Sequence, residues 1–469
     1  MSEPEVPWRR LHPASLVVNL IPTAWRTLRS TWPLLLAVVW GGGRLQGFVD
    51  LILVGSFFAT AAVRTILHFA TLRYRFARGR LEIQQGLFSR IEQALDPARI
   101  QNVSIEQNLF HRLAGLVELR IEMAGAGSGP VDGMLSALSV DEAETLRVQL
   151  GRSGAHVNAS AGETEAFDAP GLLEVVAYGV TAGRVGAAAI GIGIALDLST
   201  QLAPGALPTQ RFGAYTWVGL MLVALALGYA LSAGNAILRY YRFRWWRAGD
   251  HLHFESGLFT RRRMDIPVRK LQLVQINEPI LRRAMGFATL LLETAAAPGP
   301  VTGGAVPAEG IVPMVPREEA VERVRAAFPA LDTPIDDALH PCAPRARSRA
   351  AFRGALRWLG PAVGAVFWFG NPAAWALVGV GALVGWLDAR RQGWQVTDHY
   401  IVVRRGFLSR DTWVLPRQKL QSVHWVQGPV ARSAGLAQVV VWFPGGRLPL
   451  PELTEQHARE LFARLRPAG

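Results

Sequence analysis

Three stretches of this sequence repeat one spacing of basic residues, and these residues are the best suited to binding chemistry. The stretches align without a gap from Gly86, Gly257 and Gly406. One basic column follows the glycines and contains Arg90, Arg261 and Arg410, and a second contains Arg99, Lys270 and Lys419. Cations in either column could hold a lipid phosphate or an acidic partner through charge-assisted contacts. The same columns could instead make structural hydrogen bonds or pair one module with another, and the repeat alone leaves both interpretations open.

The basic columns are not equivalent in the three copies. Arg261 is followed by Arg262 and Arg263, whereas Arg90 is followed by Ile91 and Glu92 and Arg410 by an aspartate. Only the second copy therefore has an arginine cluster, which argues against three equivalent lipid sites.

The remaining matched columns favour structural roles. A glutamine column, consisting of Gln101, Gln272 and Gln421, is interpreted as satisfying strand or turn backbone. A second glycine column consists of Gly115, Gly286 and Gly435. Together with the first glycines, these positions are typical of tight turns, because glycine adopts backbone angles that other residues avoid.

The elements that must position these residues share one order in each copy. Alternating apolar and polar residues, such as Leu81 and Ile83 in the first copy, predict strands before and after the turn glycines. Amphipathic helices are expected at 141–150, 318–328 and 455–465, with Ser139 and Glu142 as a capping box and Thr454 as an N-cap. Several short strands closed by one helix predict a small barrel or sandwich.

Apolar tracts precede each module in pairs. They cover 31–40 with 48–69, 185–198 with 215–238, and 358–369 with 373–387. These predict six transmembrane helices in three hairpins, although several tracts are shorter than the roughly 20 residues that span a bilayer. The arginine-rich outer flanks, such as Arg242 and Arg390, predict that all soluble modules face the cytoplasm. No cleaved signal peptide is expected.

Composition supports a membrane protein and excludes several function classes. The 469 residues are 50% hydrophobic and only 18% charged, with a net charge of +13, whereas soluble proteins average about a quarter charged residues. The arginines crowd the ends of apolar tracts rather than one soluble patch, so no nucleic-acid partner is expected. The single cysteine, Cys342, allows no disulfide within the chain and no cysteine cluster. We expect no catalytic centre, no metal site and no cofactor.

The chain resembles the bacterial pleckstrin-homology membrane protein family of the YdbS/YdbT type. The resemblance rests on the triplicated G-[LF]-[FL]-[ST]-R, [RK]-[IL]-Q-x-V and R-x-x-G motifs, the last including Arg112, Arg283 and Arg432. It implies an α+β membrane protein in which three pleckstrin-homology-like (PH-like) modules, each closed by a C-terminal helix, follow transmembrane pairs. The expected order is segment and pair 1 (1–72), module 1 (73–152), linker (153–170), pair 2 (171–240), module 2 (241–330), linker (331–350), pair 3 (351–390) and module 3 (391–469).

The expected function is a non-enzymatic platform at the plasma membrane. Its modules would contact anionic lipid headgroups, a protein partner or further copies of the chain. One alternative is a transport or lipid-handling protein whose modules gate or cap the membrane helices. Another is an enzyme that acts on lipid or cell-envelope precursors, but no suitable cluster of titratable residues supports it.

Overall fold

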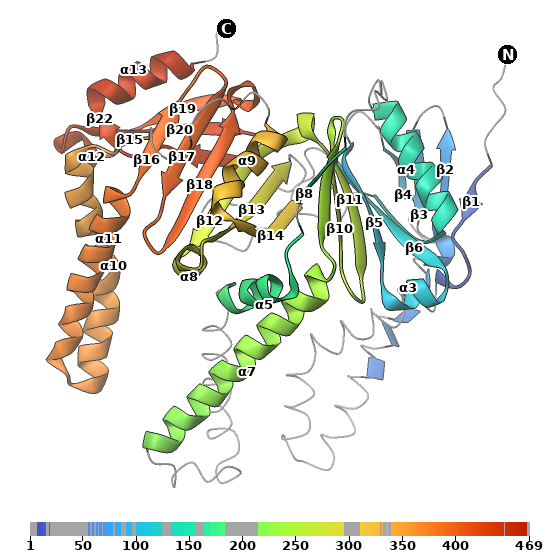
Figure 1. The fold of residues 1–469 in the computed structure, drawn as a ribbon, viewed down its shortest axis with the longest axis horizontal. Helices are drawn as coiled ribbons and strands as arrows, with labels where there is room; N and C mark the ends of the chain where they lie inside the picture. Colours follow the sequence, from blue (N-terminus) through green and yellow to red (C-terminus); the bar gives the residue numbers. More distant parts are fainter. Residues whose placement is uncertain are drawn as a thin grey trace. The chain divides into compact units, whose positions relative to one another are not determined.

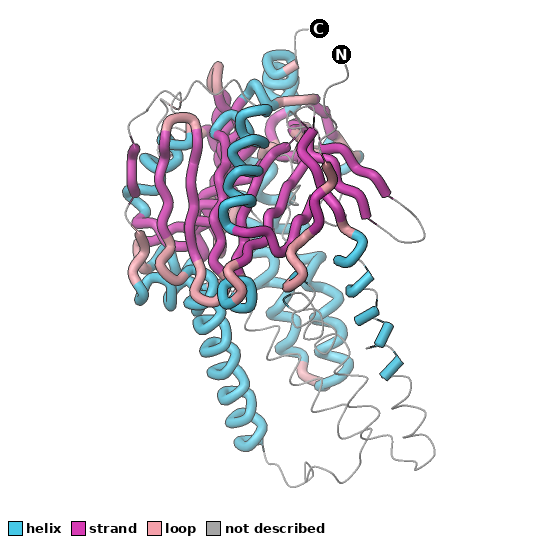
Figure 2. The backbone as a smooth tube through the Cα atoms, turned by 90° about the vertical axis from the view of Figure 1, so that its right-hand side faces the viewer, coloured by secondary structure: helices cyan, strands magenta, loops and turns pink. Residues whose placement is uncertain are grey.

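The computed structural model describes residues 7–15, 69–77, 80–85, 91–95, 100–123, 133–154, 164–167, 169–182, 214–294, 310–328, 339–444 and 446–466, with scattered positions between 18 and 67 and at 331 and 335. The chain divides into two compact units. The first contains residues 1–249 and 253–265, and the second contains residues 250–252 and 266–469. Outside a few long helices, the described chain is mostly strand (Figure 2).

The first unit contains two antiparallel sheets (Figure 1). The four-stranded sheet has the order β1-β2-β3-β4, and the seven-stranded sheet has the order β7-β6-β5-β11-β10-β9-β8. Their strands are β1 (Arg9–Arg10), β2 (Arg73–Ala77), β3 (Arg80–Gln85), β4 (Ile91–Leu95), β5 (Ile100–Gln107), β6 (Leu116–Met123), β7 (Gly133–Ser139), β8 (Thr164–Phe167), β9 (Arg244–Ala248), β10 (His251–Ser256) and β11 (Arg261–Pro267).

The second unit repeats this arrangement. Its seven-stranded sheet has the order β14-β13-β12-β18-β17-β16-β15, and a smaller sheet has the order β19-β20-β21 with β22 also paired to β20. The strands are β12 (Leu271–Pro279), β13 (Phe287–Thr294), β14 (Gly310–Pro316), β15 (His340–Pro341), β16 (Gly393–Val396), β17 (Tyr400–Arg405), β18 (Ser409–Pro416), β19 (Ser422–Val426), β20 (Leu436–Phe443), β21 (Gly446–Pro449) and β22 (Leu453–Thr454).

Each seven-stranded sheet combines strands from two successive repeats. The second half of repeat 1 (β5, β6 and β7) continues into the first half of repeat 2 through the β5–β11 pairing. The second half of repeat 2 continues into the first half of repeat 3 through the β12–β18 pairing. The stretches expected as linkers also contribute edge strands, because β8 pairs with β9 and β15 with β16. Successive modules are therefore joined by backbone hydrogen bonds.

Amphipathic helices close the outer modules as the sequence predicts. Helix α4 (Val140–Gly154) buries Ala143, Leu146 and Leu150 against the first core, and the Ser139 Oγ accepts a hydrogen bond from the Glu142 amide at 3.2 Å. Helix α13 (Glu455–Leu465) buries its apolar face in the last core and has Thr454 as N-cap. In repeat 2, helix α9 (Arg317–Ala327) occupies the corresponding place. Three expected helices are confirmed.

The expectation of six transmembrane helices is wrong for the part of the chain that the structure describes. Only residues 372–390 there form a helix that is long and apolar enough to cross a membrane, and the described chain is otherwise dominated by β-sheet. The tracts 31–40 and 185–198 lie outside the described residues, as does most of 48–69. Tract 215–238 lies in helix α7 (Ala214–Tyr240). Tract 358–369 ends helix α10 (Pro344–Phe369), whose first half is rich in arginine.

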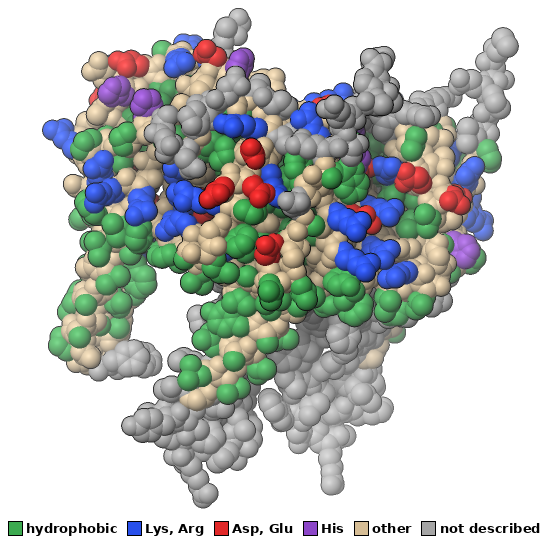
Figure 3. All heavy atoms as spheres, in the orientation of Figure 1, with side chains coloured by type: hydrophobic (Ala, Val, Ile, Leu, Met, Phe, Trp, Pro, Cys, Tyr) green, Lys and Arg blue, Asp and Glu red, His purple; other side chains and the backbone are tan. Residues whose placement is uncertain are grey.

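Helices α10 and α11 (Ala376–Arg390) form a tight antiparallel hairpin. Gly370 ends α10 in the left-handed conformation, and a short helical turn, η4 (Pro372–Trp375), leads into α11. The two backbones touch, since a Cβ on Gly354 would lie 2.1 Å from the carbonyl oxygen of Gly381. Small residues allow such close packing of helices. Many hydrophobic side chains are exposed on this hairpin, and Figure 3 shows them on the face in view.

Candidate functional site

The first-column arginine of repeat 3 is held inside the β12–β18 junction. Arg410 lies opposite Glu278 in the strand register, and its Nε and Nη2 atoms each donate a hydrogen bond of 2.6 Å to a different oxygen of the Glu278 carboxylate. The side chains of Arg410 and Glu278 are 12% and 4% exposed. Arg317 approaches the same carboxylate at 3.2 Å. A buried, two-pronged ion pair of this kind fixes geometry as well as charge.

Polar side chains continue the junction beside this ion pair. Asn277 and Gln275 donate hydrogen bonds to the Oδ1 of Asp411 at 2.6 and 2.9 Å. Burial raises the pKa of Asp411, and these two hydrogen bonds oppose the increase. The junction is thus a closed polar network.

The equivalent arginine of repeat 2 is left open. Arg261 lies opposite Gln107, whose side-chain amide donates to the Leu116 carbonyl at 3.0 Å. Arg261 is exposed and has no ion-pair or hydrogen-bond partner among the described side chains. Its neighbour Arg262 pairs with Glu106 at 3.1 Å, and Arg263 pairs with Glu255 at 3.2 Å. Of the three clustered arginines, Arg261 is available for an external ligand.

A glycine turn places an apolar side chain beside each of these arginines. Gly257 and Gly406 have φ angles of +112° and +97°, and a Cβ there would lie 1.9 and 1.7 Å from a backbone oxygen. Only glycine fits this conformation without distortion. The turns expose Phe259 and Leu408, which are 53% and 52% exposed.

Backbone hydrogen bonds fix the first of these turns to the end of a long helix. The amides of Gly257 and Leu258 donate to the carbonyls of Tyr241 and Leu238 at 3.0 and 2.9 Å, at the end of α7.

The second turn is fixed in a similar way. The Phe407 amide donates to the Asp388 carboxylate at 3.1 Å, at the end of α11. The guanidinium of Arg391 lies 5.5 Å from the centre of the Phe407 ring.

Short helices add further exposed apolar side chains. They are α3 (Leu109–Leu113), α8 (Ile280–Ala284) and α12 (Pro429–Ser433). Leu113 is 80% exposed, Leu281 is 55% exposed and Val430 is 61% exposed. Each short helix also contains one member of the Arg112, Arg283 and Arg432 column.

Together these elements form two equivalent surfaces, which we call rim 1 and rim 2. Each combines a short helix, the glycine turn of the next repeat and the end of the helix that leads into that repeat. Rim 1 consists of Leu109, Arg112, Leu113, Tyr241, Arg242, Phe259 and Arg261. Rim 2 consists of Ile280, Leu281, Arg283, Met285, Arg390, Arg391, Phe407, Leu408 and Arg410.

Rim 2 concentrates positive charge. Arg283 donates to the Phe407 carbonyl at 3.3 Å, which links α8 to the glycine turn. Desolvation lowers the pKa of Arg283, and Arg410 and Arg391 lower it further. The Nη1 atom of Arg283 is shielded from solvent and has no hydrogen-bond partner among the described residues. An anion at this rim would offset the repulsion among the three arginines and would accept a hydrogen bond from Arg283 Nη1.

Aromatic rings accompany the arginines at both helix ends. Arg239 lies 5.6 Å from the ring centre of Tyr240, and Arg390 lies 5.2 Å from that of Trp386. Arginine and amphipathic aromatic side chains together are typical of the membrane interface.

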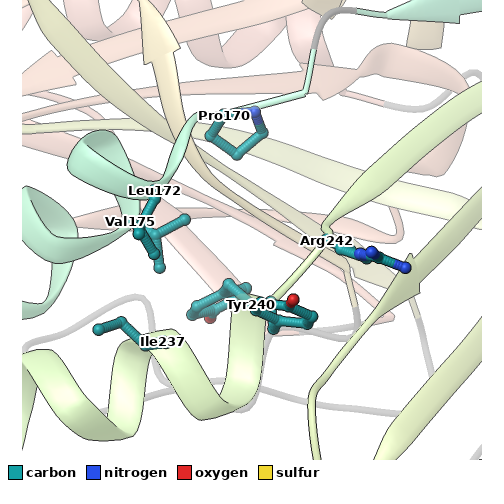
Figure 4. Close-up of a pocket in the computed structure, with 7 residues that line it drawn as sticks. Pro170, Leu172, Val175, Ile237, Tyr240 and Arg242 are labelled. Carbon is teal, nitrogen blue, oxygen red and sulfur yellow. The ribbon is translucent and has the colours of Figure 1, made fainter.

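A cavity of about 240 Å³ opens beside rim 1. Figure 4 shows Pro170, Val175, Ile237 and Tyr240 around it, with Arg242 at one side. Val175 lies on helix α5 (Leu172–Thr181). The walls are mainly apolar, so the cavity suits a hydrocarbon chain better than a polar substrate.

The second basic column lies away from the rims. Lys270 and Lys419 end the short turns η3 (Val268–Lys270) and η5 (Arg417–Lys419), beyond the far ends of β11 and β18. A strand of this length separates them from Arg261 and Arg410 by roughly 20 Å. Desolvation lowers the pKa of Lys270 to about 8, with Arg269 contributing, and Lys419 donates a hydrogen bond to the Arg269 carbonyl. The two basic columns therefore do not form one site.

The other matched positions fall on turns and strands. The side-chain amide of Gln272 donates to the Lys270 carbonyl at 3.2 Å, and the backbone N–H of Gln421 donates to the Trp442 carbonyl at 2.8 Å. Gly115, Gly286 and Gly435 follow the short helices with positive φ angles, and Gln101 lies in β5. Gly86, Arg90 and Arg99 lie outside the described residues.

Sequence comparison of the repeats missed the apolar part of the rims and the partner of Arg410. Phe110, Leu281 and Val430 share one column but vary in type, so no matched residue marks them. The available signal was their common position, five residues before the second glycine column. The described residues contain no group of three or more His, Cys, Asp or Glu side chains that could hold a metal.

Comparison with known proteins agrees with this architecture. A family model described as "Bacterial PH domain" matches residues 18–153, 188–328 and 355–468. The UPF0699 transmembrane protein YdbT of Bacillus subtilis (strain 168) is 22% identical over 450 residues, which cover 90% of this chain and 89% of that protein.

Proposed function

Because this chain belongs to the bacterial PH domain family, we propose that it is a membrane-anchored, non-enzymatic platform whose rims contact anionic lipid headgroups. In this proposal the modules, joined within each unit by strand pairing, serve as a scaffold at the membrane surface for protein partners.

The observation that carries the proposal is the composition of the rims. Each rim joins exposed apolar side chains, such as Leu113 and Phe259 or Leu281 and Leu408, to arginines at the end of a long helix. Burying such apolar groups among lipid headgroups and acyl chains is favourable, and each nearby cation adds attraction to anionic lipid. A bilayer surface suits this combination of apolar side chains and arginines better than a soluble partner does, because anionic headgroups and acyl chains lie next to each other there.

Anchoring is supported by the helices beside the rims. Residues 372–390 could cross a bilayer, and the relative in Bacillus subtilis carries the name of a transmembrane protein. Helix α7 exposes Leu222, Leu227 and Leu231, which are 57%, 57% and 73% exposed. Lipid would cover these side chains.

The side of the membrane follows from charge. Arginines gather where α7 and α11 meet the modules, at Arg239, Arg242, Arg390 and Arg391. Positively charged flanks are retained on the cytoplasmic side. The proposal therefore places the modules in the cytoplasm, and a C-terminal reporter that is active only in the cytoplasm tests this placement.

The two first-column arginines have different roles in the proposal. Arg410 is bound by Glu278 within the junction, so it shapes rim 2. Arg261 is exposed and unpartnered among the described residues, so it binds a lipid phosphate directly.

Lipid retention by the full chain tests this assignment. The protein is reconstituted in nanodiscs of mixed phosphatidylcholine and phosphatidylglycerol, and the lipids that remain bound are identified by native mass spectrometry. One cation near a headgroup contributes about 1 kcal/mol, so Arg261→Gln should reduce phosphatidylglycerol retention by about fivefold. The control is Arg459→Gln, on α13, whose side chain is 71% exposed. Equal retention by wild type and Arg261→Gln would refute direct headgroup contact at Arg261.

A further inference from the structure

The two junctions between modules have the same register. Arg261 lies opposite Gln107 and Asp265 opposite Val103 in the β5–β11 pairing. At the matching repeat positions, Arg410 lies opposite Glu278 and Val414 opposite Val274 in the β12–β18 pairing. Every residue pair of the first junction maps onto a pair of the second. The junction is therefore a repeated way of joining one module to the next.

Each chain also has two strands that match the junction strands but pair on one side only among the described strands. Strand β4 is the repeat-1 equivalent of β11 and β18, and it ends its sheet with β3 as its single partner among the described strands. Strand β19 is the repeat-3 equivalent of β5 and β12, and in the described structure it pairs with β20 alone. The first module thus has an open acceptor edge, and the last module has the complementary edge.

The burial of β19 shows what the missing neighbour would cover. In β12, which pairs on both sides, Val274 and Ile276 are 0% and 4% exposed. At the matching positions of β19, Val423 and Trp425 are only partly buried, and the next residue, Val426, is 48% exposed. The β19 sequence contains no lysine, proline or glycine that would discourage pairing. An apolar, unprotected edge strand is a template for another strand.

We propose that β19 of one molecule adds to β4 of a second copy, in the register of the two internal junctions. That register places Val426 opposite Ile91, and Val423 opposite Ala94. The pair of Val426 with Ile91 is apolar. At the equivalent position the internal junctions have Arg262 opposite Glu106 and Asp411 opposite Asn277. A second copy is the occupant because both complementary edges belong to this chain and share a register already used twice.

The symmetry of this contact determines the kind of assembly. The two edges differ, so the interface is head-to-tail, and such contacts produce rings when they close and chains when they do not. The inference goes beyond the lipid contact proposed above and does not depend on it, so Arg261→Gln should leave the association unchanged.

Paired cysteines test the register in native membranes. The background variant is Cys342→Ala, because Cys342 is the single native cysteine. Two differently tagged full chains are co-expressed, one with Ile91→Cys or Ala94→Cys and the other with Val426→Cys or Val423→Cys, and the membranes are then oxidised. The matched pairs 91 with 426 and 94 with 423 should give at least about tenfold more cross-linked dimer than the crossed pairs, whose positions would be offset by roughly 10 Å along the strands, too far for a disulfide.

Three results would overturn the proposal. They are the absence of cross-links from all four combinations, equal cross-linking by all four, and capture of a different protein by Val426→Cys with no link to a second copy. The last result would assign the β19 edge to a separate partner.

A charge exchange separates loss of association from loss of folding. Val426→Lys places an ammonium group at the proposed contact and should abolish the oligomer seen by mass photometry in nanodiscs, with the unfolding temperature unchanged. The double variant Ile91→Glu with Val426→Lys should restore it, because the two charges would lie opposite one another. An oligomer that persists in Val426→Lys, or a monomer in wild type, contradicts the proposal.

Discussion

Arg410 and Glu278 form a buried two-pronged ion pair that joins the third repeat to the second, with both hydrogen bonds at 2.6 Å. The matching positions in the first junction are Arg261 and Gln107, which form no such pair. The residue opposite the arginine therefore decides its role. Glu278 holds Arg410 in the scaffold, whereas Gln107 leaves Arg261 available to a ligand.

Glu278→Gln should destabilise the second unit. The change leaves Arg410 and Arg317 without their shared carboxylate in a largely buried site. Removing one partner of a buried pair costs about 3 kcal/mol, so the unfolding midpoint of this unit in denaturant should fall. The full chain in nanodiscs is the sample, and Glu460→Gln on the exposed face of α13 is the control. An unchanged midpoint would mean that the pair contributes no net stability.

Gln107→Glu should create in the first junction the ion pair that the second junction already has. Arg261 lies opposite this position, so the new carboxylate should bind it and reduce phosphatidylglycerol retention to the level of Arg261→Gln. The variant loses the hydrogen bond from the Gln107 amide to the Leu116 carbonyl, which is worth about 1 kcal/mol. The new ion pair offsets part of this loss, so the unfolding midpoint should change little, which distinguishes capture of Arg261 from misfolding. Full lipid retention in Gln107→Glu would argue that Arg261 does not hold the headgroup.

The repeat alignment predicted these arginines but could not separate their roles. Arg261 and Arg410 occupy one column, and the difference lies in Gln107 and Glu278, which come from the preceding repeat. Strand pairing between repeats is a long-range contact that no local pattern encodes. The closing helices were predictable because caps such as Thr454 and an amphipathic spacing are local signals.

The expectation of six membrane helices fails for a related reason. A run of apolar residues fixes composition but not helix boundaries, and α10 begins at Pro344, well before its apolar part. The PH-like modules were accessible only through the family resemblance, since alternation predicts strands without their order. The β8 and β15 edge strands are too short for any periodicity to reveal.

Glu293 should make the stability of the second unit depend on pH. Its side chain is buried on β13, and its Oε2 atom has no hydrogen-bond partner among the described residues. Desolvation raises its pKa from 4.5 to about 7. The folded state therefore binds the proton more tightly, so this contribution to stability is complete below pH 4.5 and is lost as the pH rises through 7.

Glu293→Gln should remove that dependence. The unfolding free energy of wild type should fall by about 3 kcal/mol between pH 4.5 and pH 8 because of this residue, and the variant should lack this component. Glu322→Gln, on helix α9, controls for a general change of charge. Parallel pH profiles for wild type and Glu293→Gln would show that Glu293 is not a buried acid.

Gly406→Ala should disrupt rim 2. The new Cβ would lie 1.7 Å from the Ser409 carbonyl oxygen, at a φ of +97°, so the turn that carries Leu408 must move. The combined overlap and backbone strain should cost about 3 kcal/mol. Gly115→Ala is the matched control, because its φ is +66° but its Cβ would meet nothing within 4 Å, and it should cost only about 1 kcal/mol. Equal losses in thermal stability would indicate strain alone rather than the close approach.

Leu408 should lie at the depth of the lipid headgroups or just below them. It is 52% exposed in the structure, and it lies in the turn that the Phe407 amide fixes to the end of α11. Arg283 and Arg391 both contact the neighbouring residue, Phe407. An environment-sensitive fluorophore is attached at Leu408→Cys in the Cys342→Ala background, in the full chain reconstituted with lipids that carry quenchers at known depths. Burial among acyl chains should shift its emission to the blue and allow quenching by a label near the glycerol level. The same probe at Glu460→Cys, on the exposed face of α13, should emit as in water and remain unquenched. If both probes behave alike, rim 2 does not contact the bilayer, and the arginines around Leu408 must instead bind a soluble anion or an acidic protein.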